Sequence, residues 1–174
     1  MINKNEIVLK PLVENDIILL ESWLDKEYIK KWFGDKEDWL NEINERDGKY
    51  DFLKHFIVYH NDQRIGYCLY ADCFYLKDLE EDGHDFNSLY GGVPEENHTF
   101  EIGYLIGEEE YLSKGIGKLL IQLLEEKLIE IGCKEIAADP VESNVISIKV
   151  LLSNGFQKKH DGDYRKVINR QCIK

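Results

Sequence analysis

Two glycines one residue apart, Gly115 and Gly117, separate a strand-like segment from a leucine-rich segment in the stretch YLSKGIGKLL. Glycines at such a junction leave backbone N–H groups uncovered at the positive end of the following helix, which favours an anion there. Lys114 and Lys118 add positive charge at the same place, although the chain carries a net charge of −12. This pattern indicates a phosphate-bearing ligand, with a tight strand-to-helix corner as the alternative. It is not a P-loop, and the dinucleotide fingerprint needs a third glycine that is absent here.

Two carboxylates are candidates for acid–base chemistry. Glu101 lies on a predicted strand, and because side chains alternate along a strand, it points the same way as Gly103 and Leu105. On an inward face its carboxylate would be partly desolvated, which raises the pKa toward a value useful to a general base. Asp139 follows the next predicted strand, where its negative charge suits a cationic ligand. The alternatives are an exposed strand carboxylate for Glu101 and an Asp-Pro turn for Asp139.

One mixed α/β domain covering residues 1–174 is expected to position these groups, because the chain shows no repeat and no obvious linker. The apolar periodicity predicts a strand in 6–12, helical segments in 14–34 and 35–48, a hairpin in 51–75 with its turn at 61–64, a strand in 99–107, a helix in 115–132, a strand in 134–140, a helix in 144–155 and a final hairpin in 156–173 around 161–163. Residues 77–98 hold seven acids against one lysine and are expected to form a long loop. That loop is either solvated or an acidic wall for a substrate.

Caps and inward faces follow from the same patterns. Asn15 or Asp16 is expected to cap the helical segment of 14–34, whose residues Ile17, Leu20, Trp23 and Leu24 share one face. Six apolar residues of the helix in 115–132 are expected to point inward: Leu119, Leu120, Leu123, Leu124, Leu128 and Ile131.

Composition narrows the class of protein. No apolar run reaches the roughly 18 residues that span a bilayer, and the first residues lack the apolar centre of a secretory signal, so we expect a cytoplasmic protein that does not bind membranes. The four cysteines and five histidines show no ligand spacing, so no metal is expected. The net charge of −12 repels nucleic acid and favours a cationic small molecule, unless it serves solubility alone.

The stretch EIGYLIGEEEYLSKGIGKLL resembles motif A of the GNAT superfamily of acetyl-CoA-dependent N-acetyltransferases, and DPVESNVISIKVLLSNGF is similar to the segment that follows it in that family. The resemblance implies a mostly antiparallel sheet with a splayed parallel strand pair and flanking helices. It also implies acetyl-CoA as co-substrate and a set of coenzyme-binding residues: Leu105, Ile106 and Gly107 against the pantetheine arm, Ser113, Lys114, Gly115, Ile116, Gly117 and Lys118 around the pyrophosphate, and Asn144. A backbone N–H near Leu105 or Ile106 is the expected oxyanion donor.

The family pattern also bears on catalysis. Glu101 stands where many members carry a catalytic glutamate, and Asp139 stands where related enzymes bind substrate ammonium groups, so both are candidates for the base and for substrate binding. Leu151 replaces a tyrosine that often protonates the leaving thiolate. Gly103 replaces an aspartate common in the aminoglycoside enzymes, and Leu112 replaces the glutamine or arginine of the motif.

Within the superfamily, IGEEEYLSKGIG and DPVESN are closest in pattern to the bacterial aminoglycoside 6′-N-acetyltransferases. This implies acetyl transfer to a primary amine of a cationic small molecule, with an aminoglycoside, and hence antibiotic resistance, as the leading hypothesis. A protein N-terminus, a polyamine or another metabolite amine stays open as the acceptor. A non-catalytic acyl-CoA sensor, favoured by Leu151, is a third hypothesis. The sequence leaves both a monomer and a homodimer open.

Overall fold

The computed structural model describes residues 2–79, 85–159 and 162–168. Its seven strands follow the order β1-β2-β3-β4-β5-β7-β6 in one mixed sheet. The strands are β1 (Ile7–Pro11), β2 (Leu53–His60), β3 (Gln63–Asp72), β4 (Thr99–Ile106), β5 (Glu135–Ala138), β6 (Gln157–Lys158) and β7 (Tyr164–Val167). β4 pairs with β5 in parallel, whereas β1–β2, β5–β7 and β6–β7 are antiparallel. The expected mixed fold with a parallel pair is confirmed.

The helices are α1 (Ile17–Leu24), α2 (Glu27–Phe33), α3 (Lys36–Asn44), α4 (Cys73–Leu76), α5 (Phe86–Tyr90), α6 (Ile116–Glu130) and α7 (Val145–Ser153), with the short 3-10 turns η1 (Lys4–Glu6), η2 (Glu14–Asp16) and η3 (Glu109–Tyr111). The chain forms two compact units, each assembled from two segments of sequence. The first unit comprises Met1–Leu69 and Gly103–Leu123, and the second comprises Tyr70–Ile102 and Leu124–Lys174.

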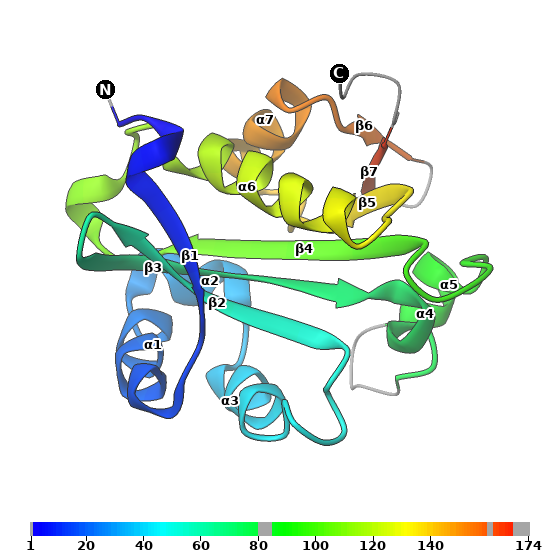
Figure 1. Cartoon of the computed structure of the whole chain (residues 1–174), viewed down its shortest axis with the longest axis horizontal. Coiled ribbons are helices and arrows are strands. Elements are labelled where there is room, and N and C mark those ends of the chain that lie inside the picture. The colour runs from blue at the N-terminus through cyan, green and yellow to red at the C-terminus, as the bar shows by residue number, and fades with distance from the viewer. Residues whose placement is uncertain (1, 80–84, 160–161, 169–174) are drawn as a thin grey trace. The chain divides into compact units, whose positions relative to one another are not determined.

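The core of the first unit lies between its helices and strands. Figure 1 shows α1, α2 and α3 gathered on one side of β1 and β2. Trp23 and Leu20 of α1 and Ile43 of α3 are fully buried there, together with Ile57 of β2. Burying such side chains is the main favourable contribution to folding, at roughly 1.5–3 kcal/mol each. The expected inward face of 17–24 is confirmed for Leu20, Trp23 and Leu24, whereas Ile17 is only partly buried.

The start of the first helical segment differs from expectation. Asp16 precedes α1, but its backbone is helical and its side chain does not cap the helix. Its carboxylate instead accepts the N–H of Val13 at 3.1 Å and pairs with Arg64 at 3.0 Å. The segment 14–34 is also two helices rather than one, because Lys26 is extended (ψ 128°) and its Nζ donates to the Gly107 carbonyl at 2.6 Å.

Two further expectations need correction. Ile131 is 44% exposed, because α6 ends at Glu130 and Gly132 turns the chain with a φ of 96°. Within the acidic segment 77–98, residues 86–90 form α5, whose N-cap Asp85 accepts the N–H of Ser88 at 2.9 Å. The segment is therefore not a loop throughout, and its residues 80–84 lie outside the described part of the chain.

The expected hairpin of 51–75 forms as β2 and β3, but β3 ends at Asp72, and residues 73–75 lie in α4 rather than in the strand. β5 and α7 form within the expected 134–140 and 144–155, and β6 and β7 make the final hairpin, of which residues 160 and 161 are not described. Cys68, Cys73 and Cys133 are free thiols with no exposed surface, and Cys172 lies outside the described residues. Over the described ranges, no helix has the length and apolar character of a membrane span, and no cluster of metal-ligating side chains occurs.

Candidate active site

The turn between η3 and α6 has a left-handed backbone at two positions. Ser113 (φ 60°) and Gly115 (φ 82°) are both left-handed, a conformation that costs a residue with a side chain roughly 1–2 kcal/mol and costs glycine almost nothing. α6 begins at Ile116, so Gly117 lies in its first turn rather than before it. Gly115 therefore supplies the left-handed turn, whereas Gly117 belongs to the helix.

Six successive amides in this turn are uncovered. The first N–H that bonds back along α6 is that of Leu119, to the Gly115 carbonyl at 3.4 Å. In the stretch 113–118, which the structure describes in full, no backbone N–H donates to a carbonyl. Their partial charges add to the positive end of the α6 dipole, so the turn suits a diphosphate. Lys114 and Lys118 flank it.

Gly117 is favoured by packing as well as by access. A Cβ at this position would lie 3.0 Å from the ring of Tyr104 on β4, so the tyrosine would have to move by a few tenths of an ångström. The turn is further anchored through Tyr111, whose hydroxyl contacts His60 Nδ1 at 3.0 Å and donates to Gln63 at 3.1 Å. The sequence pattern indicates only the ligand access that Gly117 gives, not this packing.

The end of β4 is fixed by residues that the sequence does not reveal. The Gly107 N–H donates to the Ile65 carbonyl at 2.8 Å, and its own carbonyl accepts Lys26 Nζ at 2.6 Å and Tyr28 Oη at 2.7 Å. A Cβ on Gly107 would lie 2.2 Å from the Trp23 indole. Both polar groups of Gly107 thus have partners within the protein. Burial and the nearby acids Glu109 and Glu108 raise the pKa of Tyr28 to about 12, so it stays a hydrogen-bond donor.

The second unit places the candidate carboxylates on one face of the sheet. Glu101 pairs with Ala137 across the parallel strands, and Ala137 pairs with Arg165 across the antiparallel strands. Because residues in one row share a face, the side chains of Glu101 and Arg165 lie on either side of the small Ala137. Asp139 follows two residues after Ala137, at the carboxyl end of β5, and is exposed.

Glu101 has the electrostatic character expected of a base. The residue retains some exposed surface, but burial of its carboxyl group, followed by the nearby Asp139 carboxylate, raises its pKa to about 7. The hydroxyl of Tyr90 and the guanidinium of Arg165 act in the opposite direction and favour the charged form. The structure therefore brings Glu101 and Asp139 together, and a carboxyl group that titrates near neutral pH can accept a proton there.

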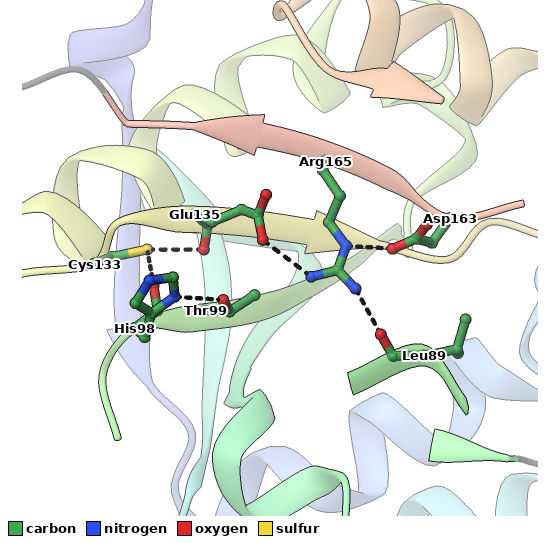
Figure 2. A network of polar contacts seen from close by, with 7 residues as sticks. All are labelled: Leu89, His98, Thr99, Cys133, Glu135, Asp163 and Arg165. Carbon is green, nitrogen blue, oxygen red and sulfur yellow. Dashed lines mark hydrogen bonds and ion pairs between the residues drawn. The ribbon is translucent and has the colours of Figure 1, made fainter. Parts of the chain in front are cut away.

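Arg165, which lies in the same row of the sheet as Glu101, is held by three acceptors, as Figure 2 shows. Its Nε donates to Asp163, its Nη1 to Glu135 at 3.2 Å and its Nη2 to the Leu89 carbonyl at 2.9 Å. Three donors directed to three fixed acceptors hold the guanidinium in one orientation. Neither Arg165 nor its partners carry a sequence signal, since they come from β7, β5 and the segment 77–98.

Asn144 immediately precedes α7, and Leu151 lies within it. The Asn144 side chain accepts the Ser147 N–H at 3.2 Å and so caps α7, which leaves its amide N–H₂ for another contact. Leu151 is buried with 2% exposure, so an apolar side chain fills the position where the family often has an acid.

Comparison with known proteins gives a family and a fold. Residues 17–156 match the acetyltransferase (GNAT) family. Among solved structures, the aminoglycoside acetyltransferase AAC(6′)-Ib in complex with coenzyme A aligns with a TM-score of 0.73 at 23% identity, over 95% of each chain. The same enzyme with coenzyme A and kanamycin gives 0.72 at 22% identity, again over 95% of each chain.

More distant structures share the fold as well. The aminoglycoside N(6′)-acetyltransferase of Legionella pneumophila aligns with a TM-score of 0.65 at 18% identity, over 92% of this chain and 90% of that one. The N-acetyltransferase PseH of Campylobacter jejuni gives 0.60 at 18% identity, over 95% and 99%. At these identities the likeness establishes the fold and leaves the acceptor substrate open.

Proposed function

The chain belongs to the acetyltransferase (GNAT) family, whose members are acetyl-CoA-dependent acyltransferases, and from that premise we propose that it acetylates a primary amine of a cationic small molecule. The 6′-amine of an aminoglycoside is the first acceptor to test. The observation that carries the proposal is the carboxylate pair of Glu101 and Asp139, in which one group titrates near pH 7 and the other is exposed. Several solved structures with this fold are described as aminoglycoside acetyltransferases, which supports the choice.

We assign coenzyme binding to the first unit. The uncovered amides of 113–118, with Lys114 and Lys118, would hold the pyrophosphate, and the backbone of Leu105 and Ile106 would pair with the pantetheine arm. Gly107 would support that segment rather than pair with it, because its polar groups already have partners. Asn144 of the second unit would add a contact, and residues 1–174 would act as one acetyltransferase domain.

We assign acceptor binding and proton removal to the second unit. An ammonium group bound by Asp139 and Glu101 loses one proton to the Glu101 carboxylate, which leaves the nitrogen lone pair free to attack the thioester carbonyl. As the carbon–nitrogen bond forms and the carbon–sulfur bond breaks, the nitrogen gives its second proton to water, which leaves the neutral amide and the thiolate of coenzyme A. The thiolate takes its proton from water, since Leu151 offers none.

A second candidate, the non-catalytic acyl-CoA sensor, is favoured by the buried Leu151 alone. It shares the coenzyme site with the first proposal and differs in having no acceptor. A protein N-terminus or a polyamine as acceptor would use the same carboxylates. Calorimetric titration with acetyl-CoA, followed by a thiol-release assay, separates these possibilities.

The acceptor panel holds kanamycin, ribostamycin, spermidine and a peptide with a free N-terminus. Turnover of the aminoglycosides with the highest kcat/KM supports the first proposal. Turnover of spermidine or the peptide alone rejects the aminoglycoside. Tight binding of acetyl-CoA with transfer to none of the four supports the sensor, and absence of coenzyme binding rejects every version.

A further inference from the structure

The hydroxyl of Tyr90 is buried and lacks a hydrogen bond of regular geometry within the described part of the chain. Tyr90 is the last residue of α5 and is 1% exposed, and among the described residues its Oη makes no hydrogen bond of acceptable geometry. Buried hydroxyls in native proteins nearly always have a partner, because desolvating one without compensation is unfavourable. A hydroxyl kept in this state suggests a group that a ligand completes.

The ring of Tyr90 is firmly held. The Arg165 guanidinium lies 5.0 Å from the centroid of the ring, and Phe86 stacks on it with an interplanar angle of 15°. Arg165 in turn is oriented by Asp163, Glu135 and the Leu89 carbonyl (Figure 2). The cation–π contact and the donors of Arg165 therefore hold α5 and β7 together, so the hydroxyl cannot turn toward bulk water without disrupting the network.

Tyr90 lies in the neighbourhood of the carboxylate pair. Glu101 and Arg165 occupy one row of the sheet with Ala137 between them, and Tyr90 lies under the Arg165 guanidinium. Burial raises the pKa of Tyr90 well above its ordinary value, and the carboxylates of Glu101 and Asp139 both raise it further. Tyr90 Oη is thus close enough to Glu101 to favour its charged form, but it makes no hydrogen bond of regular geometry with the described residues, which leaves it able to accept one.

We propose that Tyr90 Oη is the third oxygen of an ammonium-binding site whose other two oxygens come from Glu101 and Asp139. A primary ammonium has three N–H donors, and the three oxygens offer one acceptor each. A phenol can donate its own proton to Glu101 and at the same time accept an N–H of the ammonium. This inference rests on the proposed function and adds a selectivity: an unsubstituted primary amine binds better than its N-methyl derivative, which lacks the third donor.

The test compares two tyrosine variants. Tyr67 is as buried as Tyr90, but its hydroxyl is paired with His55 Nδ1 at 2.6 Å in the first unit. Tyr90→Phe removes a hydroxyl that lacks a hydrogen bond of regular geometry and is expected to lower Tm less than Tyr67→Phe, which removes a paired one. With the best amine of the panel, Tyr90→Phe should raise the acceptor KM by about 10- to 100-fold and leave the KM for acetyl-CoA unchanged. Tyr67→Phe should change neither KM.

Two further measurements separate a binding role from a structural one. The ratio of kcat/KM between the primary amine and its N-methyl derivative should fall toward one in Tyr90→Phe. The acid limb of its kcat/KM profile should move to higher pH, because the hydroxyl that favours charged Glu101 is gone while Asp139, Arg165 and Asp163 remain. A lower Tm in Tyr90→Phe with an unchanged acceptor KM overturns the inference and leaves the acetyltransferase proposal intact. Wild-type protein that acetylates no amine overturns both.

Discussion

The turn of 113–118 and the carboxylate cluster around Glu101 differ in the atoms that form them, which are backbone groups in the turn and side-chain groups in the cluster. The turn is made of backbone: its left-handed residues, its uncovered amides and the glycine against Tyr104 do not depend on which exposed side chains stand at 114 and 118. The cluster is made of side chains from separate elements, and Arg165 alone joins β7, β5 and the residue before Tyr90.

This difference predicts how each region responds to substitution. A site of amides tolerates most side-chain substitutions and fails when the backbone conformation is lost. A site of side chains can be altered one group at a time, and each group shifts the pKa of the others. We therefore expect coenzyme binding to depend on conformation and acceptor binding to depend on charge, and substitutions in the two regions test this from the largest effect to the smallest.

Glu101→Gln should lower kcat by about 10²- to 10⁴-fold, the usual contribution of a general base, and leave the Kd of acetyl-CoA unchanged. Wild-type kcat/KM should fall as the pH drops below about 7, because the base must be charged, and this limb should vanish in the variant. The exposed Glu130→Gln is the matched control. A wild-type pH profile retained in Glu101→Gln would show that another group is the base.

The same variant gives a stability readout. Burial raises the folded pKa of Glu101 from 4.5 to about 7, so its contribution to stability is complete below pH 4.5 and is lost as the pH rises through about 7. Thermal unfolding should show that Glu101→Gln gains more Tm relative to wild type at pH 8 than at pH 4.

Asp139→Asn should raise the acceptor KM by about tenfold or more with a smaller change in kcat, because a charge-assisted contact is lost. It should also move the acid limb to lower pH, since the Asp139 charge raises the pKa of Glu101. Glu142→Gln, an exposed acid three residues away, should do neither. A loss of kcat larger than that of Glu101→Gln would make Asp139 the base.

Gly115→Ala should weaken coenzyme A binding by about tenfold, because a side chain at a φ of 82° costs roughly 1–2 kcal/mol and distorts the turn. Gly34 is a close match: it also has a positive φ of 67° and, like Gly115, no atom within 4 Å of the place that an added methyl group would take. Gly34→Ala should lower Tm about as much as Gly115→Ala does, because the two backbone strains are alike. It should leave coenzyme binding unchanged in calorimetry. Equal binding losses in both variants would mean that the turn has no special role.

Lys118→Ala should raise the Kd of coenzyme A by only about two- to fivefold, because an ion pair at the protein surface contributes little. The difference from wild type should shrink further between low and high salt as the charge is screened. The exposed Lys134→Ala serves as control. A loss of a hundredfold would show that the site relies on side-chain charge rather than on amides.

The same contrast explains what the sequence could reveal. The turn and α6 are local or periodic features that the glycine spacing and the regularly spaced leucines indicate directly, whereas the parallel pair follows only from the family resemblance. The contacts of Gly107 with Lys26, Tyr28 and Trp23 join residues about 80 positions apart and leave no local pattern. The row of Glu101, Ala137 and Arg165 depends on strand register, which a single sequence does not specify. α5 is too short for periodicity, and only Asp85 as its N-cap marks it.

The buried cysteines have a practical consequence. Burial raises the pKa of Cys133 to about 11 and that of Cys73 well above its ordinary value, so neither forms a reactive thiolate in the folded protein at neutral pH. In a Cys172→Ser background, a chromogenic disulfide reagent should therefore react with the thiol of each coenzyme A molecule released and leave the cysteines of the folded enzyme unmodified. The same reagent, added during heating, should measure the fraction of unfolded protein, because unfolding exposes the buried thiols.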